Sequence, residues 1–371
     1  MSWLSGLDDS IINFLYKLKK ENSKFDYSPV IFSDNTIDEN INLGFSCYAL
    51  KILKLTDEIK KFSENDLNEW SRYLKSYQNR DLKYPINSFI DKSYINSFKS
   101  SNYFSGMAYP LKYLFNTFQN KDYKSNKQKI ENYIRAETKQ TISTLYEINK
   151  KNENKYKDFP INENEVKNYL NSLNWSYPWS SGGQFSAMCV FSKTQTNNEE
   201  YKNSSKSILE FADSIVNQAS GLYYKGNPPK NYELINGAMK VLTGLDWLEA
   251  KIHYPEKIID FCLSSDISSK GCDMVDVVYV LYRCSKETNY KKKEVIDYLD
   301  NILKMIKVHY NPNDGGFSYF QKYNQTHYYD LKIADTQLRS DIHGTLLCVW
   351  AIVMIMDLSE KKFFNFNVLK P

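Results

Sequence analysis

The sequence predicts an all-α protein in which the helices form an (α/α)6 toroid, a ring of six inner helices surrounded by six outer ones. Three observations support this prediction. Helical periodicity runs through nearly the whole chain, strand-like alternation is scarce, and glycines open six apolar helical segments. Because no linker-like stretch divides the 371 residues, we expect a single domain over residues 1–371.

Amphipathic helices are expected where apolar residues recur at intervals of three and four. In chain order these segments are Ile11–Lys19, Leu67–Tyr77, Ile130–Ile148, Val166–Leu173, Ile208–Val216, Val241–Leu248 and Val295–Ile306. Within the longest of them, Glu137 and Lys139 are expected to be surface charges.

The inner helices are expected in apolar segments that follow a glycine. These glycines are Gly44, Gly106, Gly182 with Gly183, Gly237, Gly271 and Gly344. A small residue near a helix start lets neighbouring helices approach closely at the narrow centre of a ring. Each interval leaves room for a more charged, outer return helix. The most apolar run, Leu346–Met356, is far shorter than the roughly 20 residues of a membrane span, so we expect a core helix there.

Composition narrows the class of protein. The formal net charge of +4 is too small for a nucleic-acid-binding surface. The six cysteines form no CxxC pair, and several lie in apolar runs, which is typical of reduced, buried thiols. The first residues lack the basic start and apolar core of a signal peptide. We therefore expect a cytoplasmic protein that acts on a small molecule or glycan, with no membrane span and no nucleic acid.

Four titratable residues near the starts of predicted inner helices are the candidate catalytic groups. We expect His343 with Asp341 to form one acid–base arm, and Asp273 with Asp276 the other. Each has a plainer interpretation. Asp341 is equally suited to capping a helix, His343 to a hydrogen-bonded core position, and the two other aspartates to an exposed first turn.

Polar and aromatic residues near the same helix starts predict how a ligand would be held. The candidate substrate-binding residues are Trp179, Gln184, Tyr224, Asn236, Lys240, Asp314 and Phe317. Sugar hydroxyls need paired donors and acceptors, and sugar faces stack on aromatic rings. The leading hypothesis is therefore an enzyme that acts on a sugar or glycan by acid–base chemistry. A non-catalytic toroid that binds a glycan or peptide remains open.

Two motifs in the last third of the chain resemble the terpenoid-cyclase and protein-prenyltransferase superfamily. Asp314-Gly-Gly-Phe317 is similar to its DGGF turn, and Asp341-Ile-His343-Gly-Thr345 is similar to the Asp-x-His-x-Thr segment before the last inner helix of prenyltransferase β subunits. The resemblance implies an α/α toroid and, as the alternative function, an isoprenoid transferase or cyclase. The acidic DxDD motif of the cyclases is absent.

The same resemblance implies a zinc site that this sequence matches only in part. His343 and Asp276 correspond to two zinc ligands of the prenyltransferases, but Val278 stands where their cysteine ligand would be. Cys272 lies one helical turn before Asp276 and would have to replace it. Our expectation is that no cofactor is needed, with Cys272, Asp276 and His343 as the alternative zinc ligands.

Overall fold

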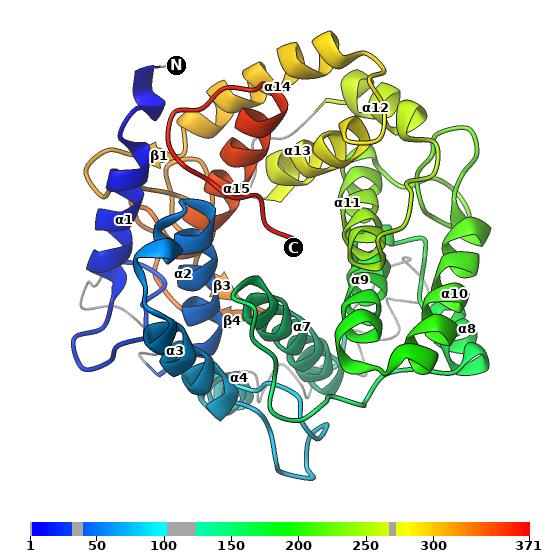
Figure 1. Ribbon diagram of the computed structural model, residues 1–371, viewed down its shortest axis with the longest axis horizontal. Helices are drawn as coiled ribbons and strands as arrows, with labels where there is room; N and C mark the ends of the chain where they lie inside the picture. The colour runs from blue at the N-terminus through cyan, green and yellow to red at the C-terminus, as the bar shows by residue number, and fades with distance from the viewer. Residues whose placement is uncertain (1, 32–39, 102–123, 267–271) are drawn as a thin grey trace.

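The computed structural model describes residues 2–31, 40–101, 124–266 and 272–371. Within them the chain forms the predicted all-α toroid, a closed ring of helices around a central opening (Figure 1). No helix in these ranges is both long and apolar enough to cross a membrane.

Six helices form the inner ring. They are α2 (Leu43–Leu55), α7 (Asn126–Glu147), α9 (Pro178–Gln195), α11 (Asn231–Leu248), α13 (Cys272–Ser285) and α15 (Ile342–Leu358). Each packs against the next one in this order, and α15 packs against α2, which closes the ring (Figure 1). Both ends of the sequence therefore contribute to one core.

The remaining helices lie mainly around the outside (Figure 1). They are α1 (Leu7–Leu18), α3 (Glu64–Ser76), α4 (Lys92–Ser101), α8 (Glu163–Ser172), α10 (Asn198–Ile215), α12 (Pro255–Ser264) and α14 (Lys292–Lys307), with 3-10 turns at Ser2–Leu4 and Glu58–Lys61. Their sequences bury one face only. In α14, for example, Val295, Leu299, Ile302 and Ile306 are buried while the lysines are exposed.

Two small antiparallel hairpins precede α15. One pairs β1 (Tyr310–Asn311) with β2 (Gly316–Phe317), and the other pairs β3 (His327–Tyr328) with β4 (Leu331–Lys332). The first packs against α1, and the second reaches towards the centre of the ring between α2 and α7 (Figure 1).

Most glycine-opened segments occupy the inner ring as predicted. Gly44 and Gly344 lie in the first turns of α2 and α15, Gly182 and Gly237 lie in the second turns of α9 and α11, and α15 is buried almost throughout. Gly106 and Gly271 lie outside the described residues, although α13 begins directly after Gly271. The inner helix α7 starts at a Ser125 capping box and has no glycine at its start. All six cysteines are free, and five are buried.

The closest inner-helix contact joins α9 and α11. A Cβ atom on Gly237 would lie 2.5 Å from the Cβ of Pro178, which is closer than two non-bonded carbon atoms can approach. Gly183, by contrast, has nothing within 4 Å of its added Cβ. One glycine is therefore required by packing and the other is not.

We predict that Gly237→Ala lowers the free energy of unfolding by about 1–3 kcal/mol, because the methyl group must displace Pro178 and the first turn of α9. The matched control, Gly183→Ala, should raise stability by up to about 1 kcal/mol, since alanine favours a helix more than glycine does. Chemical denaturation of both variants checks the pair. Equal effects would refute the close approach.

Candidate active site

The centre of the ring contains a cavity of about 830 Å³. We call it the central cavity. Its walls come from α7, α9 and α11, with Lys51 of α2, and Tyr329 and Asp330 from the turn of the second hairpin. Pro371 also borders the cavity, and its carbonyl oxygen accepts a hydrogen bond from Trp247 Nε1 at 2.8 Å.

Basic side chains dominate this lining. The cavity residues include the six cations Lys51, Lys124, Lys129, Arg135, Lys139 and Lys240. Only two acidic side chains, Glu233 and Asp330, lie among them. Lys129 pairs with Asp330 at 3.1 Å, and Glu233 accepts the main-chain N–H of Trp179. The remaining positive charge is therefore not balanced by side chains of the cavity wall.

Three lysines from three different inner helices influence one another across this space. Lys51 donates a hydrogen bond to Ser143 Oγ at 3.1 Å, whereas neither Lys139 nor Lys240 has a hydrogen-bond or ion-pair partner in the described part of the chain. Burial, and then the charges of Lys240 and Lys51, hold the pKa of Lys139 well below its usual value. Burial also lowers the pKa of Lys51.

Polar and aromatic groups complete the wall. The predicted ligand residues Trp179 and Gln184 both line the cavity, and Trp179 is 40% exposed. Gln184 accepts hydrogen bonds from Arg135 and Tyr169 and donates one to Asn132 at 3.0 Å. Amides held in this way offer fixed partners for ligand hydroxyl groups.

Asp276 lies in the second turn of α13 and is 3% exposed. Its Oδ2 atom has no hydrogen-bond partner among the described residues. Burial raises the pKa of Asp276 to about 7, with Asp273 adding to the rise and Lys240 opposing it. This carboxyl group therefore still holds its proton over much of the range below neutral pH.

His343 is clamped at the start of α15. Its ring stacks between Tyr48 and Tyr319, with centroid distances of 5.0 and 5.1 Å, and its Nδ1 lies 3.0 Å from Gln325 Oε1. An amide oxygen only accepts hydrogen bonds, so Nδ1 carries the proton and Nε2 presents its lone pair. Burial, and then the charge of Lys240, lower the pKa of His343 to about 3, so the imidazole is neutral.

Lys240 connects these two groups to the central cavity. It lines the cavity, and its charge lowers the pKa values of both Asp276 and His343. Neither Asp276 nor His343 is itself part of the cavity wall, but both feel the charge of this cavity-lining lysine.

The alternative zinc site does not fit the geometry. No group of three His, Cys, Asp or Glu side chains in the described ranges is arranged to hold a metal ion. Cys272 instead lies 3.2 Å from the hydroxyl oxygen of Tyr319, and burial raises the pKa of its thiol to about 11.

Asp341 caps a helix, which was the structural alternative to a catalytic role. Its Oδ1 accepts the N–H of Gly344 at 2.7 Å, and its Oδ2 accepts those of Tyr319 and Gln325 at 2.7 and 3.0 Å. It is the N-cap of α15 and holds the preceding loop in place. Although burial raises its pKa to about 6, we assign it a positioning role and leave it out of the acid–base pair.

Several predicted ligand residues lie away from the central cavity. Phe317 is completely buried against Trp3 and Tyr310, so it cannot touch a ligand. Asp314 accepts hydrogen bonds from Asn311 and from the N–H of Ser340, as a turn-forming residue does.

Two further predicted ligand residues are also not part of the cavity wall. Tyr224 does not line it and pairs through its main chain with Ile215. Asn236 is buried and donates to Asp273 Oδ1 at 3.0 Å, which leaves its own Oδ1 without a partner among the described residues. Asn236 and Asp273 therefore belong to the surroundings of Asp276.

The prediction that Glu137 and Lys139 are surface charges is wrong, because α7 is an inner helix. Glu137 is completely buried and accepts a hydrogen bond from Tyr328, and burial raises its pKa to about 8. The missed signal was the stripe formed by Asn132, Arg135, Lys139 and Ser143, all of which line the cavity. Their spacing of three or four residues places them on one face of the helix.

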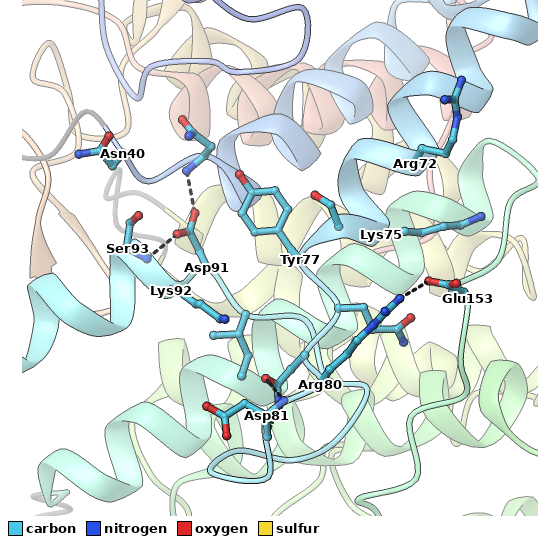
Figure 2. Close-up of a pocket in the computed structure, with 15 residues that line it drawn as sticks. Asn40, Arg72, Lys75, Tyr77, Arg80, Asp81, Asp91, Lys92, Ser93 and Glu153 are labelled. Atoms are coloured by element: carbon cyan, nitrogen blue, oxygen red, sulfur yellow. Dashed lines mark hydrogen bonds and ion pairs between the residues drawn. The ribbon is translucent and has the colours of Figure 1, made fainter.

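A larger hollow of about 1180 Å³ lies on the outside of the ring, beside α3 and α4 (Figure 2). Three of its charged groups have partners within the fold. Asp91 accepts the N–H groups of Asn42, Leu43 and Ser93, and so holds the starts of α2 and α4. Arg80 pairs with Glu153 at 3.2 Å (Figure 2). We therefore place the candidate site in the central cavity.

Comparison with known proteins found no matching family model and no match among curated proteins. A crystal structure described as a possible member of the GH105 family from Salmonella enterica serovar Paratyphi A covers 95% of this chain and 94% of its own, with 12% sequence identity and a TM-score of 0.43.

The raised pKa of Asp276 predicts a pH-dependent stability. Between about pH 4 and 7 the folded state holds a proton that the unfolded chain releases, so this residue stabilises the fold at low pH and loses that effect as pH rises through about 7. Relative to wild type, Asp276→Asn should therefore gain stability between pH 4.5 and 8, by on the order of 4 kcal/mol at most. Urea denaturation at both pH values measures this difference. An unchanged difference would show that Asp276 titrates normally.

Proposed function

We propose that this protein is an enzyme that acts on an anionic sugar or glycan in the central cavity, with Asp276 as general acid and His343 as proton acceptor. The observation that carries the proposal is the carboxyl group of Asp276, which is buried and lacks a partner for Oδ2 among the described residues beside the cavity-lining Lys240. An acid with a pKa near the working pH is best suited to protonate a leaving group.

The charge of the cavity supports an anionic ligand. Six basic side chains face two acidic ones, and one of those two is neutralised by an ion pair. A carboxylate, sulfate or phosphate group would offset the repulsion among Lys51, Lys139 and Lys240. The amides of Asn132 and Gln184 and the ring of Trp179 then suit the hydroxyl groups and the face of a sugar.

His343 is suited to accept a proton only when an anion is bound. In the free protein, burial and the charge of Lys240 keep its pKa at about 3, which makes it a weak base. An anionic group that pairs with Lys240 would weaken the second of these effects and raise the basicity of Nε2. The ligand charge would therefore help to activate the catalytic base.

The same lining disfavours the isoprenoid alternative. An isoprenoid chain needs a mainly apolar cavity, whereas this wall carries six cations and the side-chain amides of Asn132, Gln140 and Gln184. A non-catalytic, glycan-binding toroid would share the charged wall but would not need a protonated Asp276.

The proposal predicts binding that depends on ligand charge. Uronic-acid, sulfated or phosphorylated sugars should bind more tightly than their neutral counterparts, and added salt should weaken the binding. Lys240→Met should reduce affinity for the anionic ligand by about tenfold or more. Calorimetric titration measures both effects. Equal affinity for neutral and anionic sugars would contradict the proposed ligand class.

For a sugar that binds, Asp276→Asn should lower turnover by about 10²–10⁴-fold with little change in affinity. Gln184→Ala is the comparison, because removing a ligand-binding amide should weaken binding more than turnover. Full turnover by Asp276→Asn would remove this residue from the mechanism. If the protein binds anionic sugars but turns none over, the binding-protein alternative is favoured.

A further inference from the structure

We propose that Lys139 is a nucleophilic amine that forms an imine with the carbonyl group of an anionic ligand held in the central cavity. The inference rests on the proposed function only in taking the ligand to be anionic. It adds a covalent step that acid–base catalysis by Asp276 and His343 does not require.

The position of Lys139 provides the first support. It lies midway along α7 and lines the cavity, with Lys51 of α2 and Lys240 of α11 as the cations that act on it. Lys139 has no hydrogen-bond or ion-pair partner in the described part of the chain, so its amine is not held by a structural contact. Its neighbours instead suit the anionic part of a ligand.

The surroundings of Lys139 also favour the neutral amine. Burial and the two neighbouring lysines lower its pKa, and the opposing influence comes from the thiol of Cys189 on α9. Burial raises the pKa of that thiol, so Cys189 remains uncharged. A lysine that is desolvated and flanked by other cations keeps its lone pair available for attack on a carbonyl carbon.

The proposed step balances without any redox partner. The lone pair of Lys139 Nζ attacks the carbonyl carbon, a C–N bond forms, and the π electrons move to oxygen. Two protons leave the nitrogen and two reach the oxygen, which departs as water and leaves a C=N bond. The open-chain form of a reducing sugar supplies an aldehyde or ketone of this kind, so the acceptor is an anionic sugar with a free carbonyl group.

The test is reductive trapping with an anionic and a neutral aldehyde, 4-formylbenzoate and benzaldehyde, in the presence of cyanoborohydride at pH 7. Intact mass and peptide mapping then locate the secondary amine. We expect 4-formylbenzoate to label Lys139 first, and faster than benzaldehyde does. Lys193 is the internal reference. Burial lowers the pKa of Lys193, but its hydrogen bond to Glu249 and nearby charges raise the pKa by more, so the overall shift is upward. The neutral amine fraction changes about tenfold for each unit of pKa.

Three variants sharpen the test. Lys139→Met should abolish the fast label, and thermal unfolding should show that this variant remains folded. Lys240→Met should slow labelling of Lys139 several-fold, because it removes both a like charge and an anion partner. Lys193→Met should leave the rate at Lys139 unchanged.

The outcomes separate this inference from the proposed function. Labelling of Lys139 no faster than of Lys193, or an unchanged rate in Lys240→Met, would overturn the reactive lysine even if anionic sugars bind. Fast, charge-dependent labelling without any sugar binding would support the lysine and contradict the proposed function.

Discussion

The contact between α15 and α2 closes the ring, and the rest of the structure depends on how α15 begins. Asp341 caps that helix and also binds the main chain of Tyr319 and Gln325. Gly344 has no space for a side chain, because the main chain of Ser318 and Tyr319 lies directly against it. The loop and the helix start therefore form one rigid unit. That unit carries His343, its stacking partner Tyr319 and its hydrogen-bond partner Gln325.

Inside the closed ring, the burial of charged groups is unfavourable, and repulsion between lysines adds to it at Lys139. Burial lowers the pKa values of Lys51 and Lys139, and the charges of Lys240 and Lys51 lower that of Lys139 further. Such an arrangement costs stability in the empty protein and is typical of sites where function, not folding, determines the residues. An anionic ligand would replace the repulsion among the lysines by an attraction between the lysines and the ligand. The same charges that weaken the empty fold would then contribute to binding.

Sequence patterns were sufficient for the architecture because glycines and apolar periodicity report directly on close helix packing. They placed α2, α9, α11 and α15 correctly, and also identified Trp179, Gln184 and Lys240 as cavity residues. They failed at α7, because the sequence of a helix with a polar face towards a cavity does not differ from that of a helix with a polar face towards solvent. Only the closed ring of helices shows which of the two the polar face meets. Phe317 was misassigned for the converse reason, since an aromatic residue beside a polar turn can pack inward against α1 and β1.

The two motifs that resemble the terpenoid-cyclase superfamily are joined to each other by hydrogen bonds in this chain. Phe317 donates its N–H to Thr345 Oγ1 at 2.9 Å and accepts the Thr345 hydroxyl in return, while Asp314 accepts the N–H of Ser340. The two motifs thus bind each other and fasten the first hairpin to α15. Such a junction stabilises the ring without specifying a reaction. Of the groups proposed for chemistry, His343 is carried by this junction, whereas Lys139, Lys240 and Asp276 lie on α7, α11 and α13. Those three can change without disturbing the junction.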